Sequence, residues 1–97
     1  MSAAWTLPAE LTIYTAAQTR EAWLAALATD DTDEPLRAHA AAVAEVDSAG
    51  LQLLVSLRRS LASARRTLHL HEPSEVLRIA CARSGLGDIL VTEGGAA

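Results

Sequence analysis

Several residue types are missing or scarce in this chain of 97 residues. Lysine is absent, so all eight basic residues are arginine, and neither a Schiff-base lysine nor the lysine of a phosphate-binding loop is available. A single cysteine, Cys81, excludes an intramolecular disulfide and a cysteine-rich zinc site. No apolar run approaches the roughly 20 residues that span a bilayer. These absences exclude several classes of enzyme, disulfide-stabilised scaffolds and direct insertion into a membrane.

The charge of the chain is also informative. Its formal net charge is −4 and its pI is near 5.2, so the chain lacks the excess of positive charge that attracts nucleic acid or an anionic membrane. The first residues lack the basic start and apolar run of a signal peptide. We therefore expect a cytoplasmic protein that does not bind nucleic acid.

The composition indicates one globular domain over residues 1–97, with a loose tail over about residues 92–97. Hydrophobic residues make up 51% of the chain, but aromatic residues only 3%, and phenylalanine is absent. The core must therefore be built from Leu, Val, Ile and Ala. Aliphatic packing of this kind suits helices laid on a sheet.

The pattern along the chain alternates strands with helices, which predicts an α/β fold with a mostly parallel sheet. Thr15 and Gln18 match the spacing of a capping box at the first helix. Ser74 is expected to cap the last long helix, and Gly85 to end it in a left-handed conformation. The short apolar patch over residues 5–7 is the first expected strand, and the others cover residues 11–14, 37–42 and 67–71. The expected helices cover about residues 15–28, 51–66 and 74–85, with a short helical turn over residues 86–91.

The sequence Glu-Val-Asp-Ser-Ala-Gly-Leu-Gln-Leu-Leu, residues 45–54, joins a strand-like run to a leucine-rich helix. Asp47 or Ser48 can cap this helix, because its first turn has unpaired amide donors. The same donors and the helix dipole can also hold a phosphate on Ser48. Gly50 would let a partner approach the backbone closely. Local chemistry alone does not decide whether Ser48 is a helix cap or a phosphorylation switch.

Other candidates for chemistry favour structural interpretations. The Ser48 region lacks the first glycine of a Gly-x-Ser-x-Gly nucleophile elbow, so we expect no catalytic residue and no enzyme activity. His69 and His71 share one strand face, and two ligands are fewer than the three or four that a zinc site normally needs. We therefore expect no metal and no cofactor.

Three further features are expected to be structural. The acidic stretch over residues 29–35 is expected to be a solvated loop, because it lacks the alternating ligands and glycine of a calcium loop. Cys81 lies on the apolar stripe of its helix and is expected to be a small buried hydrophobe. The arginine pairs 58–59 and 65–66 are expected to form a solvated helix face.

The run Val-Ala-Glu-Val-Asp-Ser-Ala-Gly-Leu-Gln-Leu-Leu, residues 43–54, resembles the signature of the STAS domain. This domain is shared by anti-sigma-factor antagonists and the cytoplasmic tails of sulfate transporters. The strand at residues 11–14, the strand at residues 67–71 and the segment 74–90 extend the resemblance over nearly the whole chain. It implies a four- or five-stranded mixed β-sheet with helices packed on one side.

The resemblance also implies a function in bacterial signal transduction by protein–protein interaction. In anti-sigma-factor antagonists, the unphosphorylated domain binds a serine kinase that sequesters a sigma factor, and phosphorylation breaks the complex. Ser48 would be the phosphoacceptor, and Asp47, Ser48, Ala49, Gly50 and Gln52 would line the partner-binding face. The short single-domain form also resembles the STAS subunit of phospholipid-trafficking ABC transporters, which docks on an ATPase, and STAS proteins of chemotaxis and signalling. The partner is thus expected to be a kinase and anti-sigma factor or an ABC ATPase.

Overall fold

The structure is a computed structural model and describes residues 4–30 and 32–87. Within these ranges, five strands and three helices follow in the order β1 (Ala4–Thr6), β2 (Glu10–Leu11), α1 (Ala16–Ala28), β3 (Leu36–His39), β4 (Glu45–Val46), α2 (Ser48–Ser63), β5 (Leu68–His71) and α3 (Glu75–Arg83). The expected α/β class is confirmed.

The strands form two small parallel sheets. One has the order β1-β3-β5, and the other pairs β2 with β4. Hydrogen bonds continue between the sheets, because the Leu7 amide donates to the His39 carbonyl at 2.9 Å and the Ala44 amide donates to the Ala9 carbonyl at 2.8 Å. The segment from β1 to β2 therefore runs alongside the segment from β3 to β4. The five strands are divided between a three-stranded and a two-stranded sheet, which is compatible with the expected four- or five-stranded fold, and each recorded pairing is parallel.

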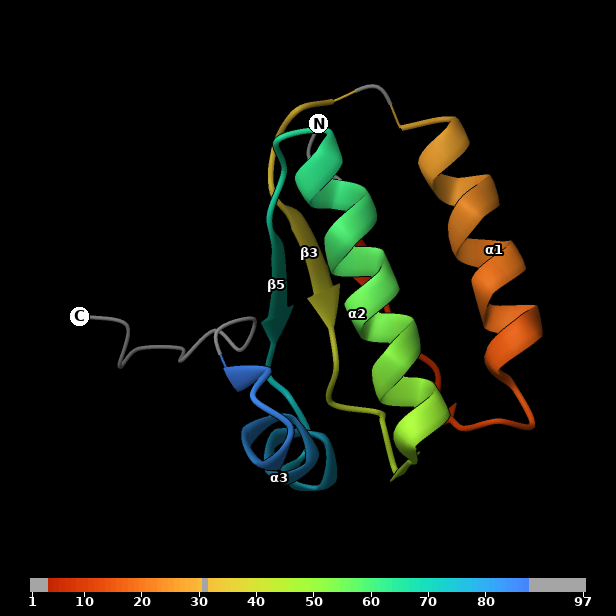
Figure 1. Ribbon diagram of the computed structural model, residues 1–97, viewed down its shortest axis with the longest axis vertical. Coiled ribbons are helices and arrows are strands. Elements are labelled where there is room, and N and C mark those ends of the chain that lie inside the picture. The colour runs from red at the N-terminus through yellow and green to blue at the C-terminus, as the bar shows by residue number, and fades with distance from the viewer. Residues whose placement is uncertain (1–3, 31, 88–97) are drawn as a thin grey trace.

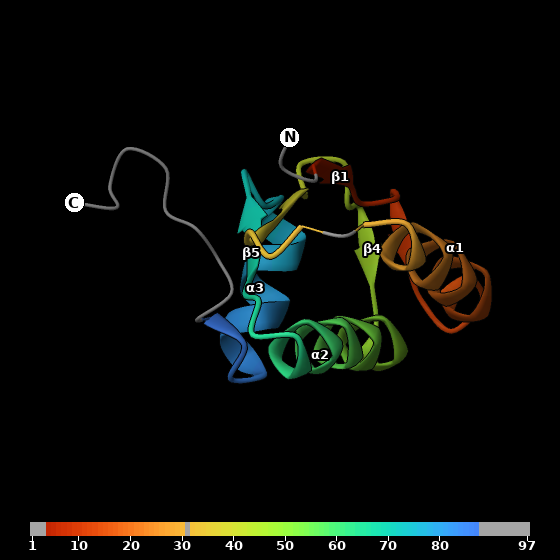
Figure 2. The ribbon, with the colours of Figure 1, turned by 90° about the horizontal axis from the view of Figure 1, so that it is seen from above.

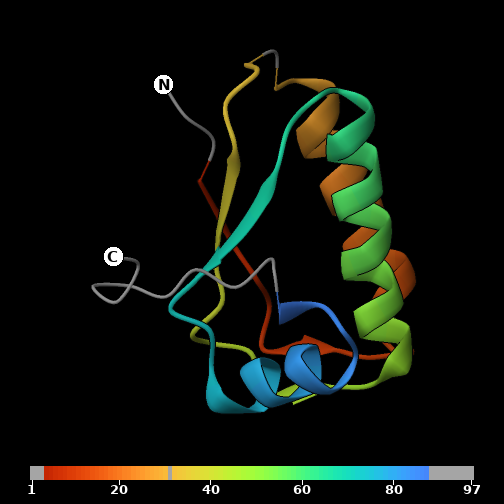
Figure 3. The same cartoon turned by 60° about the vertical axis from the view of Figure 1, so that its left-hand side comes forward.

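The helices and strands lie in two layers (Figure 1). Helices α1 and α2 lie side by side over one face of the strands, and Figure 2 shows both from their ends. Helix α3 lies at the end towards which β3 and β5 point, as Figure 3 shows most clearly. Loops that follow the strands and the first turns of α1 and α2 meet at this carboxyl end.

The core is aliphatic, as the composition predicts. Strands β3 and β5 alternate, with Leu36, Ala38, Leu68 and Leu70 buried and the residues between them turned outwards. Helix α2 buries one face, which comprises Gly50, Leu53, Leu54, Leu57 and Leu61. Removing these side chains from water is the main force that holds α2 on the strands.

Several expected boundaries were wrong by a few residues. The strand predicted at residues 11–14 ends at Leu11, because the chain turns at Thr12. The strand predicted at residues 37–42 ends at His39, and β4 forms after a turn. Helix α2 begins at Ser48 and ends at Ser63, each three residues earlier than predicted. The expected turn over residues 86–91 lies largely, and the tail over residues 92–97 entirely, outside the described residues.

The cap predictions had different outcomes. The Ser74 hydroxyl accepts a hydrogen bond from the Leu77 amide at 3.2 Å, and Gly85 has a φ of +75°, so both predictions for α3 are confirmed. The capping box at α1 was wrong. Thr15 is the N-cap residue but its side chain makes no cap hydrogen bond, because its hydroxyl instead contacts the Glu10 carbonyl at 3.0 Å.

Candidate functional site

Asp47 is the residue that caps helix α2. One carboxylate oxygen, Oδ1, accepts a hydrogen bond from the Gly50 amide at 3.0 Å, which satisfies a free donor of the first turn. The other oxygen, Oδ2, accepts from the Ile13 amide at 3.0 Å. These amides of Ile13 and Gly50 hold the pKa of the Asp47 carboxyl below its ordinary value. Asp47 is therefore a charged clamp between α2 and the loop before α1.

Ser48 is left free by this arrangement. It is the first residue of α2 and is exposed, and its hydroxyl makes no hydrogen bond to any residue that the structure describes. The choice between Asp47 and Ser48 as cap, which the sequence left open, is thus settled in favour of Asp47. The Ser48 hydroxyl is accessible to solvent and does not cap the helix.

Gly50 allows close packing between α2 and β2 in the interior of the protein. It is buried, and a Cβ at this position would lie 2.0 Å from the Leu11 carbonyl oxygen and 2.6 Å from its carbonyl carbon. Because backbone atoms cannot move aside cheaply, only glycine lets α2 approach β2 this closely. The close neighbour of Gly50 within the chain is Leu11, and the expected place of Gly50 on a partner-binding face stays a prediction.

Two large side chains beside Asp47 were missed by the sequence reasoning. Ile13 is 68% exposed and Tyr14 is 90% exposed, in the turn that the Asp47 carboxylate holds through the Ile13 amide. They were missed because residues 11–14 were interpreted as a strand. Two threonines three residues apart, Thr12 and Thr15, were the available signal, because such hydroxyls bond to nearby backbone in turns.

These residues define a carboxyl-end surface, which consists of Ile13, Tyr14, Ser48 and Gln52. Ser48 and Gln52 are one helical turn apart on α2, and both are exposed. Asp47 and Ala49 are only partly exposed at its border. The surface combines two apolar side chains with a free hydroxyl and an amide, and it includes no charged group. It can bind a partner surface but holds no arrangement of nucleophile and base.

The arginine pair at the end of α2 does not form a solvated face. Arg66 is buried, and its guanidinium contacts the Asp30 carboxylate at 3.2 Å and donates to the Glu34 carbonyl at 2.7 Å. Arg65 is exposed, with a φ of +61° that turns the chain after α2. The expectation of a solvated arginine pair was therefore wrong for Arg66. The acidic stretch is likewise not wholly solvated, because Asp30 is drawn into this ion pair.

The histidines lie on the face of β3 and β5 that is turned away from the core. His39 pairs with His71 in register, with ring centroids 6.0 Å apart, and the rings of His69 and His71 are 6.5 Å apart. The prediction that His69 and His71 share a face is confirmed. No group of three or more His, Cys, Asp or Glu side chains suited to a metal ion occurs within residues 4–30 and 32–87.

Cys81 is fully buried in α3, as its place on the apolar stripe predicts. Burial raises the pKa of the Cys81 thiol, because it disfavours the thiolate. This position therefore contributes packing and not reactivity. None of the helices in the described part of the chain is long and apolar enough to cross a membrane.

Comparisons with known proteins agree with this arrangement. A family model described as "Mlab, STAS domain" matches residues 4–92. The chain is similar to a solved structure titled "Structure of the Anti-Sigma Factor Antagonist SpoIIAA in its Unphosphorylated Form", with 26% sequence identity, a TM-score of 0.71, and coverage of 94% of this chain and 80% of that chain. A search of curated proteins found no match. The family model spans most of the chain, and the chain belongs to the STAS domain family.

Proposed function

We propose that this protein is a non-enzymatic regulatory module, similar to an anti-sigma-factor antagonist, whose carboxyl-end surface binds a cytoplasmic serine kinase that acts as an anti-sigma factor. Phosphorylation of Ser48 switches this binding off. The observation that carries the proposal is the exposed, unbonded Ser48 hydroxyl beside the exposed Ile13 and Tyr14. The similarity to SpoIIAA supports an interaction module of this kind.

The electrostatics of the site explain how a phosphate would act. Unmodified, the carboxyl-end surface has apolar and neutral polar side chains, and the clamped Asp47 carboxylate lies at its border. A phosphate on Ser48 adds about −1.5 to −2 charges at neutral pH. The start of the 16-residue helix α2 favours that charge locally. A partner that packs on Ile13 and Tyr14 would have to bury it, which costs binding energy.

A second candidate follows from the resemblance to the STAS subunit of ABC transporters. The matching family model is itself described as "Mlab, STAS domain". In this candidate the same carboxyl-end surface docks on an ABC ATPase, and Ser48 is a constant part of the interface. The two candidates differ in one measurable respect, which is the sensitivity of binding to negative charge at position 48.

The test is affinity capture from the native cytosol with four baits: wild type, Ser48→Ala, Ser48→Asp and Ser56→Asp. Ser56 is exposed on the same helix two turns away, so Ser56→Asp adds the same charge outside the surface. We expect Ser48→Asp to weaken binding of a kinase-like ATPase roughly tenfold or more, and Ser48→Ala and Ser56→Asp to bind as wild type does. Mass spectrometry of the native protein should find phosphate on Ser48.

Other outcomes separate the candidates. Capture of an ABC ATPase by all four baits would overturn the switch and support the transporter subunit. If every bait captures nothing, the interaction module itself is contradicted.

Tyr14→Ala adds a probe of the surface without a charge. We expect it to weaken either complex, because a 90% exposed aromatic side chain contributes little to folding but much to an interface.

A further inference from the structure

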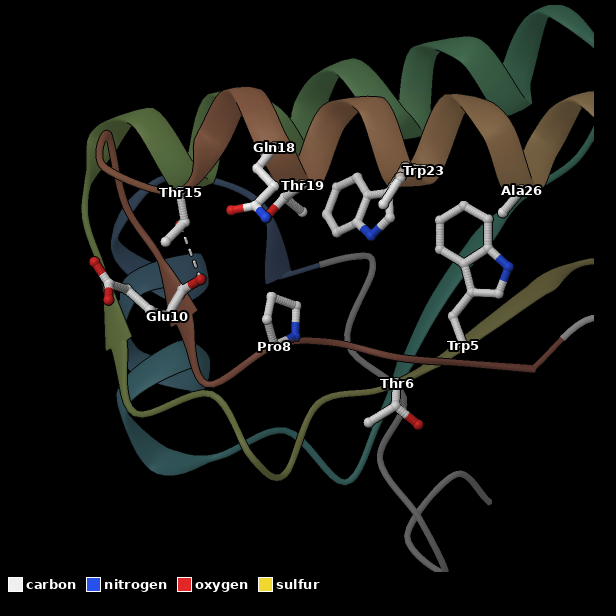
Figure 4. Close-up of a pocket in the computed structure, with 10 residues that line it drawn as sticks. Trp5, Thr6, Pro8, Glu10, Thr15, Gln18, Thr19, Trp23 and Ala26 are labelled. Atoms are coloured by element: carbon white, nitrogen blue, oxygen red, sulfur yellow. Dashed lines mark hydrogen bonds between the residues drawn. The ribbon is translucent and has the colours of Figure 1, made fainter.

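A cavity of about 480 Å³ lies between helix α1 and the chain segment that runs from β1 to β2. Its walls include Trp5 and Pro8 on the strand side and Gln18, Thr19 and Trp23 on the helix side (Figure 4). This volume is within the range of small-molecule sites, which are commonly concave and mostly apolar with a few polar groups. None of Ile13, Tyr14, Ser48 and Gln52 lines it, so it is distinct from the carboxyl-end surface.

The two tryptophans give the cavity an aromatic wall. Their ring centroids are 5.8 Å apart and the ring planes are inclined by 37°. Trp23 is 8% exposed as a residue, and its indole N–H makes no hydrogen bond to any described residue but is still open to solvent. Figure 4 shows this nitrogen turned away from α1, towards the strand segment across the cavity. An indole N–H that faces a mostly apolar cavity is a donor that a ligand carbonyl can use in place of water.

The other polar groups restrict the charge of such a ligand. Gln18 projects its amide from α1 into the space above Pro8 (Figure 4). Among the described residues that line the cavity there is no Arg or His, and the one ionisable group is Glu10, whose carboxylate accepts from the Thr12 hydroxyl at 2.6 Å. An anion would therefore find no cation and would be repelled by Glu10. Figure 4 also shows the Glu10 carboxylate at the far end from the indoles, which gives a cation no partner near the rings.

We propose that this cavity binds a small uncharged molecule that combines a flat ring with a carboxamide or similar carbonyl group. The ring lies against the indoles of Trp5 and Trp23, where offset stacking is favourable. The carbonyl oxygen accepts the free Trp23 indole N–H. The Gln18 amide pairs with the remaining polar atoms of the ligand, since an amide offers both a donor and an acceptor.

Three probes with one ring and different charges test this assignment: benzamide, benzoate and benzylamine. Trp5 and Trp23 are the two tryptophans of the chain, so the labelled protein has two indole N–H signals in a nitrogen–proton correlation spectrum. We expect benzamide to shift the Trp23 indole signal downfield in a saturable way. Benzoate, without a cation to meet it, is expected to bind roughly tenfold more weakly, and so is benzylamine, which lacks the carbonyl acceptor.

Two variants identify the contacts. Trp23→Phe keeps an aromatic ring but removes the donor, and it also assigns the indole signals. Gln18→Leu is a change at an exposed helix position, so it keeps the fold even if the core change at Trp23 does not. Each is expected to weaken benzamide binding by several-fold, whereas Tyr14→Ala, outside the cavity, leaves it unchanged.

The inference is overturned if no probe moves either indole signal, or if the two variants bind benzamide as wild type does. Binding of benzoate or benzylamine as tight as that of benzamide also contradicts it, because the site would then not select an uncharged carbonyl compound. None of these results depends on Ser48, so the inference and the proposed function succeed or fail separately.

Discussion

The two ends of the strands use polar residues in opposite ways. At the amino end, where β3 and β5 begin, Arg66 is buried and holds Asp30 and the Glu34 carbonyl, so charged groups fix the loop between α1 and β3 from within. At the carboxyl end, apolar Ile13 and Tyr14 are exposed and the Ser48 hydroxyl is free. Figure 3 shows the two ends separated by the full length of α2.

The difference indicates that the amino end stabilises the fold, and it supports our proposal that the carboxyl end binds a partner. Parallel α/β folds place ligand sites outside the carboxyl ends of their strands, where loops vary without disturbing the sheet. Here the carboxyl end still needs a rigid frame for its exposed groups. Asp47 and Gly50 supply it, the first by binding the Ile13 amide and the second by letting α2 lie against Leu11.

The largest loss of folding stability is expected from a substitution at the amino end. Arg66→Ala would leave Asp30 buried without its partner, and breaking a buried pair of this kind costs about 3–5 kcal/mol. Arg65→Ala is the matched control, because this neighbour is exposed, and its cost is expected to stay within about 0.5 kcal/mol. Urea denaturation measures both, and equal losses would show that the ion pair does not distinguish the two arginines.

The sequence could predict the layers but not this contrast. The leucine spacing of α2, the alternation in β5 and the cap at Ser74 are local patterns, and all three are confirmed. Arg65 and Arg66 are identical in type and adjacent, so nothing local could show that the turn after α2 buries one of them. Ile13 and Tyr14 likewise depend on a turn fixed by Asp47, which is 34 residues away from Ile13 in sequence.

A smaller and pH-dependent loss of stability is expected from substitution of Asp47, which clamps the carboxyl end. Asp47→Asn keeps one acceptor oxygen but loses the charge and the second acceptor for the Ile13 and Gly50 amides. Because the folded state lowers the pKa of the Asp47 carboxyl, its stabilisation is present above the unfolded pKa and is lost as pH falls through the folded pKa. At neutral pH we expect the variant to melt a few degrees below wild type.

Thermal melts of both proteins from neutral to acidic pH measure this effect. The gap should narrow once the pH falls below the ordinary aspartate pKa and close as the pH falls through the lower pKa of the folded Asp47 carboxyl, where the wild-type carboxyl becomes protonated. A gap that persists unchanged in acid would show that the charge of Asp47 is not what holds the clamp.

The smallest expected difference in folding stability is between alanine substitutions of two serines at the starts of helices. Ser74 accepts from the Leu77 amide, so Ser74→Ala should cost about 1 kcal/mol in the free energy of unfolding. Ser48 follows its cap residue and bonds to none of the described residues, so Ser48→Ala should change stability by no more than about 0.5 kcal/mol. Chemical denaturation of both variants gives the comparison. Equal losses would mean that the Ser48 hydroxyl stabilises α2 after all, whereas a cost at Ser74 alone leaves that hydroxyl available for a role outside folding.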